Sequence, residues 1–144
     1  MNNSIQNNRW GVYIWETNNV RISGNFIAGN SLCGMYLFSS GNNVIMRNNF
    51  TNNDHGLHLW RVKYTIIKEN NFIKNKVWTF ESNLESFFCR WQRNYYDKSQ
   101  IFPKIITGAS AIWNIPYPIG VIFIPYIKID WRPAQEPYDI PGMR

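Results

Sequence analysis

Three residues near the middle of the chain, Asp54, His55 and Arg61, are of the types that proton-transfer chemistry on acidic sugars requires. Such a reaction needs a base that removes a proton and a cation that stabilises the developing negative charge. His58 and Lys63 add a second imidazole and a second cation. Asp54 and His55 fall in one predicted turn, whereas Arg61 and Lys63 fall near the next, so solvated turn residues are the alternative interpretation. The group is a candidate for a lyase or hydrolase, but its residues alone assign no catalytic role.

The chain also contains ligand types that copper accepts, namely imidazole, thioether and thiol. These are His55, His58, Met35, Met46 and Cys33. The two methionines fall at inward or near-core positions of the repeat described below, where Met is a packing residue. Cys33 and Cys89 have no metal-ligand spacing and could pair only if the fold brings them close. We therefore expect no bound metal and no cofactor.

A repeat of 22 to 23 residues must position these side chains. Three columns recur at intervals of 22, 23 and 22: Asn3, Asn25, Asn48, Asn70; Ile5, Ile27, Phe50, Phe72; and Asn8, Asn30, Asn53, Asn75. Fixed periods of this length are typical of solenoids. Short alternating apolar runs exclude helical repeats, and no Leu-rich consensus is present. The sequence therefore predicts an all-β fold, a right-handed parallel β-helix with three strands per coil.

The asparagine columns have a physical role in such a fold. An amide side chain both donates and accepts, so asparagines in coils stacked ~4.8 Å apart can bond along the axis and satisfy turn backbone. A glycine column at 11, 34 and 56 marks a corner that needs positive φ or close backbone approach. Ile27 and Phe50 are expected to be buried and stacked. The expected structural ladders consist of Asn25, Asn48, Asn70, Asn30, Asn53 and Asn75.

Alternation beside the glycine column places aromatic side chains outside the helix, one coil apart. If Val12 and Ile14 point inward, the outward set is Tyr13, Trp15, Tyr36, Phe38, His58 and Trp60. A flat aromatic strip is a platform on which sugar rings can stack. The alternative is that the aromatic-rich C-terminal tail packs over the strip, and Trp60 is the residue expected to be covered, because it lies nearest the tail in sequence.

The domain organisation follows from where the repeat stops. Residues 1–97 are expected to form about four coils, and residues 98–144, which contain all seven prolines, a capping tail of short strands and loops. The stretch 105–127 carries no charge, but its prolines argue against a membrane span. Asn3 already lies mid-coil, so we expect either missing upstream coils of a longer protein or another chain at that edge. The opening MNNSIQNN lacks the features of a secretory signal.

Composition excludes one class of partner. The net charge is +6, but the Lys and Arg residues are scattered along the chain and form no run. A nucleic-acid partner is therefore not expected.

The segments GVYIWETNNVRISGNFIAGN and GMYLFSSGNNVIMRNNFTNN resemble the repeats of NosD-type, or carbohydrate-binding and sugar-hydrolysis, β-helix proteins. The resemblance covers residues 2–97. The later segments RWQRNYYD and IDWRPAQEPYDI are similar to the closing segment of archaeal, methanogen-type members, but depart from it at Tyr96, usually Trp, and at Arg132, usually His. The resemblance implies an extracytoplasmic location, at the cell surface or in the periplasm, and contact with polysaccharide. The founding role of the family is copper-site maturation of nitrous oxide reductase, but likeness of fold does not carry function.

These observations favour a non-catalytic surface or periplasmic module that contacts carbohydrate, a polysaccharide or envelope glycan. The alternatives are an enzyme of acidic polysaccharide, a structural spacer of an envelope protein, and a copper-maturation accessory.

Overall fold

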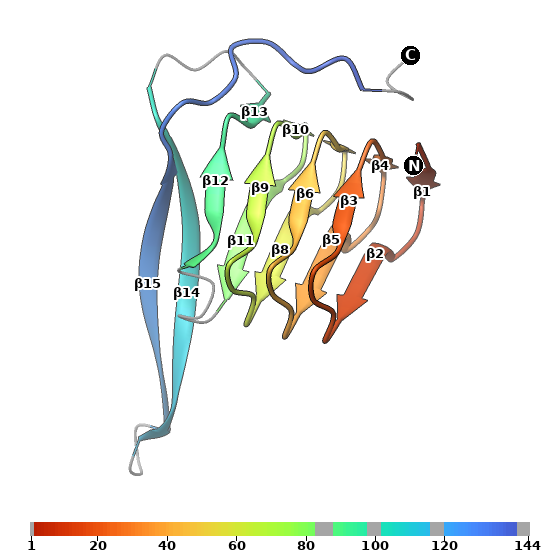
Figure 1. Ribbon diagram of the computed structural model, residues 1–144. Coiled ribbons are helices and arrows are strands. Elements are labelled where there is room, and N and C mark those ends of the chain that lie inside the picture. The colour runs from red at the N-terminus through yellow and green to blue at the C-terminus, as the bar shows by residue number, and fades with distance from the viewer. Residues whose placement is uncertain (1, 83–87, 98–101, 116–119, 141–144) are drawn as a thin grey trace.

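A computed structural model describes residues 2–82, 88–97, 102–115 and 120–140 of the chain, and it shows a parallel β-solenoid of about four turns. Successive coils stack along one axis, and each coil contributes one strand to each of three sheets (Figure 1). The predicted β-helix fold is confirmed.

Two of the three sheets consist of short strands, and the third consists of longer ones. One sheet contains β1 (Ser4–Gln6), β4 (Phe26–Ala28), β7 (Asn49–Thr51), β10 (Asn71–Ile73) and β13 (Tyr95–Tyr96), in that order. A second contains β3 (Arg21–Ser23), β6 (Val44–Met46), β9 (Ile66–Lys68) and β12 (Arg90–Gln92). The third, which we call the long-strand sheet, contains β2 (Trp10–Trp15), β5 (Cys33–Phe38), β8 (His55–Trp60), β11 (Val77–Ser82), β14 (Lys104–Ile115) and β15 (Gly120–Asp130).

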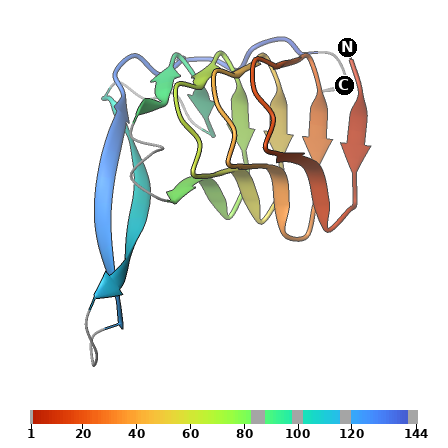
Figure 2. The same ribbon diagram turned by 60° about the horizontal axis from the view of Figure 1, so that its bottom comes forward.

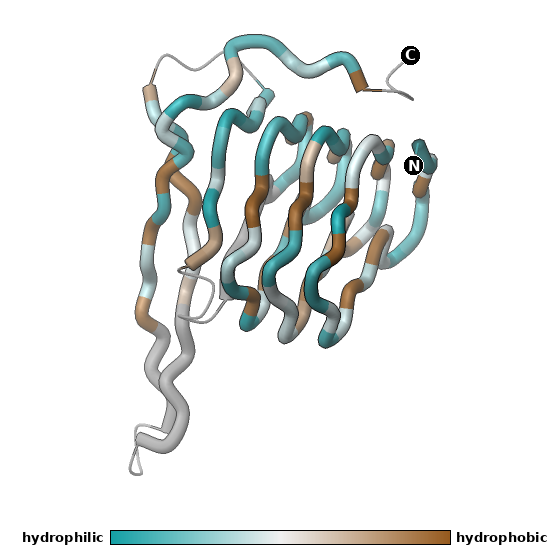
Figure 3. Tube along the Cα trace, in the orientation of Figure 1, coloured by the Kyte–Doolittle hydropathy of each residue, from teal (hydrophilic) through white to brown (hydrophobic). Residues whose placement is uncertain are grey.

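The register follows the repeat, so equivalent residues lie directly above one another. Ile27 pairs with Phe50, and Phe50 pairs with Phe72 in the next coil. All three are fully buried, and the Phe50 and Phe72 rings stack with centroids 5.0 Å apart. Hydrophobic positions recur at matching places in successive coils (Figure 3). Each buried side chain of this size contributes about 1.5–3 kcal/mol, and together these columns form the continuous core.

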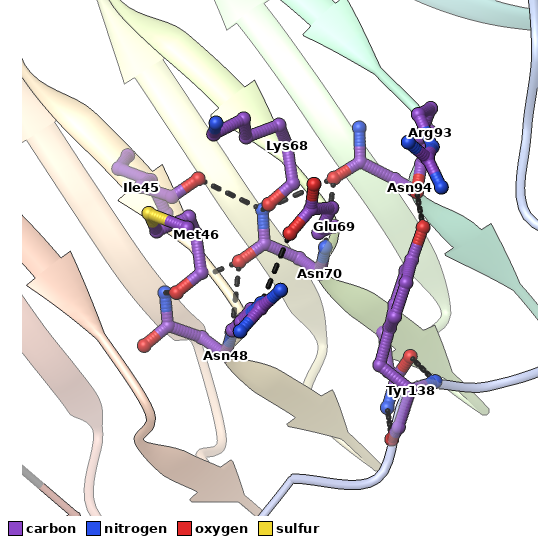
Figure 4. A network of polar contacts seen from close by, with 11 residues as sticks. Ile45, Met46, Asn48, Lys68, Glu69, Asn70, Arg93, Asn94 and Tyr138 are labelled. Carbon is purple, nitrogen blue, oxygen red and sulfur yellow. Dashed lines mark hydrogen bonds and ion pairs between the residues drawn. The ribbon is translucent and has the colours of Figure 1, made fainter.

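Hydrogen bonds join one asparagine column along the solenoid axis (Figure 4). The Asn25 backbone N–H and side-chain Nδ2 both donate to Asn48 Oδ1, at 3.1 and 2.9 Å. Asn48 donates in the same way to Asn70, and Asn70 donates to Asn94. Asn30, Asn53 and Asn75 form a second column with the same pattern. Each amide in the column both accepts and donates, so the buried asparagines form hydrogen bonds with one another and with the backbone of the turns.

The first column ends on a carboxylate. Asp130 is fully buried, and its Oδ2 accepts from Asn94 N at 2.9 Å and from Asn94 Nδ2 at 3.0 Å. Its Oδ1 accepts from Arg93 N at 2.9 Å, and the Tyr96 hydroxyl donates to Oδ2 at 3.3 Å. The last asparagine needs only an acceptor beyond it, and a carboxylate is a pure acceptor.

The glycine column serves close backbone approach. A Cβ on Gly34 would lie 2.7 Å from the Gly56 carbonyl oxygen and 3.0 Å from Asn53 Nδ2. Left-handed backbone occurs elsewhere, for example at Gly24 with φ 70° and at Arg47 with φ 50°. Of the two roles that the sequence allowed for this column, close approach applies.

The C-terminal segment continues the long-strand sheet and then returns along the solenoid. β14 pairs in parallel with β11, and β15 pairs antiparallel with β14, so the two form a hairpin that extends beyond the coils (Figures 1 and 2). The uncharged stretch 105–127 belongs largely to this hairpin. Among the described residues there is no helix with the length and hydropathy of a bilayer-spanning segment.

Residues 131–140 run along the corner that carries the asparagine column. Ala134 N donates to the Asn94 carbonyl at 3.0 Å, and the Tyr138 hydroxyl donates to the Arg93 carbonyl at 2.7 Å. Tyr138 and Asn71 exchange two hydrogen bonds of 2.9 Å (Asn71 Nδ2 to Tyr138 O, and Tyr138 N to Asn71 Oδ1). The tail therefore covers this corner rather than the outer face of the long-strand sheet.

Candidate functional site

Aromatic side chains follow the outer face of β2, β5 and β8, one set per coil. Trp15 pairs with Phe38 and Phe38 with Trp60, as the alternation predicts. Tyr13 and Trp15 are 47% and 52% exposed, and Trp60 is 38% exposed. The expectation that the tail covers Trp60 is wrong, because this side chain is 38% exposed: β14 and β15 extend the long-strand sheet at its edge, and residues 131–140 lie along a different corner of the solenoid.

The rings do not form the flat platform that the sequence suggested. Trp15 and Phe38 stack face to face, with centroids 4.3 Å apart and planes 17° from parallel. Tyr13 stacks on Tyr36 with centroids 5.2 Å apart. Stacked rings present their edges outward and cover each other's faces. Tyr36 is consequently buried, at 7% exposure.

A concave site lies where this face meets the start of β8, and we call it the aromatic hollow. Its volume is about 320 Å³. It is lined by Trp10, Leu32, Cys33, Tyr36, His55, His58 and Trp60. Three successive coils contribute these residues, because Trp10 pairs with Cys33 and Cys33 pairs with His55 in the parallel register.

Burial keeps His58, Cys33 and Tyr36 neutral at pH 7. Burial, with a smaller electrostatic contribution from His55, lowers the pKa of His58 to about 4. Burial raises the pKa of the Cys33 thiol to about 12, and it raises the pKa of Tyr36 to about 12 as well. An imidazole, a thiol and a hydroxyl that stay uncharged can each exchange hydrogen bonds without the cost of burying an ion.

His55 is oriented by its neighbours. Its Nδ1 lies 3.3 Å from the Leu32 carbonyl oxygen and 3.2 Å from Asp54 Oδ2. The two oxygens beside Nδ1 are both acceptors, so a proton on Nδ1 satisfies them and fixes the orientation of the ring. Asp54 is held in turn by Lys76, whose Nζ lies 2.7 Å from Asp54 Oδ1, and this contact lowers the pKa of Asp54.

The three candidate catalytic residues do not converge. Asp54 and His55 lie side by side at the start of β8, whereas Arg61 follows its last residue. Arg61 lies six positions after His55 along an extended strand, which corresponds to about 20 Å. Lys63 follows two residues after Arg61, beyond the end of β8. The cation nearest the Asp54 carboxylate is Lys76, which the sequence pattern did not single out.

The five candidate copper ligands are also dispersed. Met35 is fully buried in the core, and Met46 lies near Ile140 at the tail corner. Cys33 donates its thiol proton to the Met35 carbonyl oxygen at 3.0 Å. In the part of the chain that the structure describes, no three His, Cys, Asp or Glu side chains are grouped to hold a metal ion. Cys33 and Cys89 are both buried, and they form no disulfide with each other.

Trp10 is a wall of the hollow that the candidate residues did not include. Trp10, Cys33 and His55 form a column at intervals of 23 and 22, so the repeat contained the signal. That column mixes an aromatic, a thiol and an imidazole, whereas the columns that predicted the fold each repeat one chemical class: amide, apolar side chain or glycine.

Comparison with known protein families identifies one match. A family model described as periplasmic copper-binding protein (NosD) matches residues 1–111, more than half of the chain. No curated protein and no solved structure matches the chain.

Proposed function

Because the chain belongs to the NosD family of periplasmic copper-binding proteins, we propose that it is an extracytoplasmic β-helix module that binds carbohydrate in the aromatic hollow. The observation that carries this proposal is the hollow itself, which combines aromatic walls with neutral hydrogen-bonding groups on the outer face of the long-strand sheet.

The size of the hollow sets the size of the ligand. Small-molecule sites have volumes of roughly 300–1,000 Å³, and the hollow, at about 320 Å³, falls at the lower end. This volume suits one sugar ring, with the rest of a glycan chain lying across the surface outside. The hollow is therefore a site for one sugar ring, held on a rigid wall of strands.

The lining matches the two chemical sides of a sugar. Trp10, Tyr36 and Trp60 offer apolar ring surface against which the C–H face of a pyranose can pack. His58 offers a neutral imidazole, and the ring nitrogens of His55 and His58 can form hydrogen bonds with hydroxyl groups. A neutral sugar fits this lining best, so binding should depend little on ionic strength.

Copper, which the description of the family names, finds no fitting ligand set among the described residues. The two imidazoles of the hollow have a neighbouring thiol, but that thiol is held protonated, with a pKa near 12. The thioether of Met35 is enclosed in the core. We therefore derive no function of this module from a bound copper ion.

A glycan panel with two matched tryptophan variants tests the proposal. Trp60→Ala removes one wall of the hollow and should weaken retention of the bound glycan roughly tenfold, by analogy with the loss of one base–aromatic stacking contact. Trp15→Ala removes an indole of the same strip that is more exposed than Trp60 but does not line the hollow, and should leave retention unchanged.

Trp10→Ala, on the opposite wall, should behave like Trp60→Ala, and the melting temperature of each variant shows that it remains folded. Equal losses for Trp15→Ala and Trp60→Ala would assign binding to the strip at large and contradict the hollow. No retention of any glycan by the parent chain would leave a structural spacer as the function.

A further inference from the structure

A second concave site lies at the C-terminal end of the solenoid, between β12 and β15. Its volume is about 600 Å³, larger than that of the aromatic hollow. β12 is the last strand of its sheet and contacts β15, the last strand of the long-strand sheet. We call this site the basic cleft, because its charged lining consists of Arg90, Arg93, Lys128, Asp130 and Arg132.

The cleft carries an excess of positive charge. Four of its side chains are cationic, and Asp130 supplies the single carboxylate. That carboxylate is fully buried and accepts hydrogen bonds from Arg93 N, Asn94 and Tyr96, so it is turned into the end of the solenoid. Within the described residues, Arg90, Arg93 and Arg132 form no ion pair with a carboxylate, and all three are exposed.

Lys128 fixes one of these charges in the wall. The residue is only 8% exposed, and its Nζ donates to the Cys89 carbonyl oxygen at 3.0 Å. An ammonium group held in a partly desolvated wall acts on a nearby anion more strongly than one in bulk water, because the local dielectric constant is lower.

Apolar surface lies next to the charges. Trp131 is 71% exposed and Ile127 is 59% exposed, and both line the cleft. Trp91 is buried beneath it, at 5% exposure. A ligand that satisfies this lining needs an anionic group and an apolar face within one small unit.

We propose that the basic cleft binds a uronate unit of an acidic polysaccharide. The planar guanidinium groups of Arg90 and Arg132 match the two oxygens of a carboxylate, with which arginine forms paired hydrogen bonds. The C–H face of the same sugar ring packs on the exposed indole of Trp131. An acidic peptide would supply the carboxylate but no rigid ring for Trp131, so the uronate fits the lining better. This site shares no residue with the aromatic hollow, so uronate binding in the cleft does not depend on what the hollow binds.

Titration calorimetry of the full chain with a hexamer of galacturonate tests the proposal, with a neutral hexose hexamer of the same length as the reference. The parent chain should bind the uronate hexamer and should prefer it to the neutral one by at least about tenfold, because charge-assisted hydrogen bonds are roughly twice as strong as neutral ones. Arg132→Gln and Trp131→Ala should each weaken that binding about tenfold.

Two control variants test whether the uronate binds in the cleft itself. Arg9→Gln removes one exposed charge far from the cleft in sequence and outside its lining, and should leave binding unchanged. If it weakens binding as much as Arg132→Gln, the uronate responds only to the net charge of +6 and the site is refuted. Trp60→Ala should also leave uronate binding unchanged.

Titration with a hexamer of glutamate tests the alternative that the cleft binds an acidic peptide. If it binds as tightly as the uronate hexamer, the ligand is an acidic peptide and the sugar assignment is wrong. Failure of the parent chain to bind the uronate hexamer also overturns the proposal, whatever the aromatic hollow binds.

Discussion

Replacing Asn48 by Asp removes the side-chain donor from one link in the asparagine column. Asn48 is fully buried, and its Oδ1 accepts from the Asn25 backbone N–H and Nδ2. Its own Nδ2 donates to the carbonyls of Ile22 and Met46, at 3.0 and 3.1 Å, and to Asn70 Oδ1 at 3.1 Å. Aspartate has the same shape but, when ionised, cannot donate. The substitution therefore keeps the accepted bonds and removes the donated ones.

The cost follows from the three oxygens that each lose the Nδ2 donor of Asn48. Asn70 Oδ1 keeps the bond from the Asn48 backbone N–H, but it then faces a carboxylate oxygen that cannot donate to it. Each lost hydrogen bond to a buried polar group costs about 1–3 kcal/mol. A loss of about 3–6 kcal/mol is expected at pH 7, a large part of the ~5–15 kcal/mol that stabilises a typical domain.

The loss should depend on pH with a definite sign. Burial raises the pKa of the introduced carboxyl group in the folded state above its unfolded value of ~3.9. Stability is then greatest below the unfolded pKa and falls as the pH rises through the folded pKa, so the deficit of Asn48→Asp should shrink in acid.

Urea denaturation followed by tryptophan fluorescence measures this loss at pH 7 and at pH 5. Asp130→Asn is the matched comparison, because the last position of the column needs only acceptors and the amide oxygen can replace Oδ2. That variant should lose only about 1–2 kcal/mol, from the bond to Arg93 N. A cost of Asn48→Asp no greater than that of Asp130→Asn would refute the directional ladder.

Three further predictions concern the core, the corner and the hollow. Phe50→Ala should lower the free energy of unfolding by about 3–5 kcal/mol, because it leaves a cavity against Phe72, 5.0 Å away; a urea-derived loss below ~1 kcal/mol would contradict the core assignment. Gly34→Ala should lower stability by about 1–3 kcal/mol, since its Cβ would meet the Gly56 oxygen at 2.7 Å, and an unchanged melting temperature would disprove the close approach. Because the folded pKa of His58, about 4, lies below the ordinary 6.5, the unfolded chain binds the proton first and stability is lost as the pH falls from ~6.5 to ~4. The loss is on the order of 2–3 kcal/mol, and His58→Gln should remove it; an equal pH dependence in both proteins would exclude His58 as its source.

The coil register could be predicted from the repeat, because each repeated residue type suits one structural role. Asn25, Asn48 and Asn70 recur where turn backbone needs an amide, and Ile27 and Phe50 recur where the core needs volume. The periodicity alone was therefore sufficient to place these residues in columns.

The end of the solenoid could not be predicted in the same way. Asn94 follows Asn70 by 24 residues, and Asp130 lies 36 residues farther on, so neither interval matches the repeat. The bond between them depends on the β14–β15 hairpin, which brings Asp130 back to the last coil. The tilt of the outer rings could not be predicted from the sequence either. Alternation determines the side of the sheet on which Trp15 and Phe38 lie, but not how their rings pack.

The most direct test of carbohydrate binding in the aromatic hollow is the indole N–H spectrum of the protein during titration with the glycan retained from the panel. The chain contains seven tryptophans, and each indole N–H gives one resonance that single substitutions can assign. The resonances of Trp10 and Trp60 should shift together along one binding curve, while that of Trp15 stays in place. Shifts at Trp15 or Trp131 without shifts at Trp10 and Trp60 would contradict binding in the aromatic hollow.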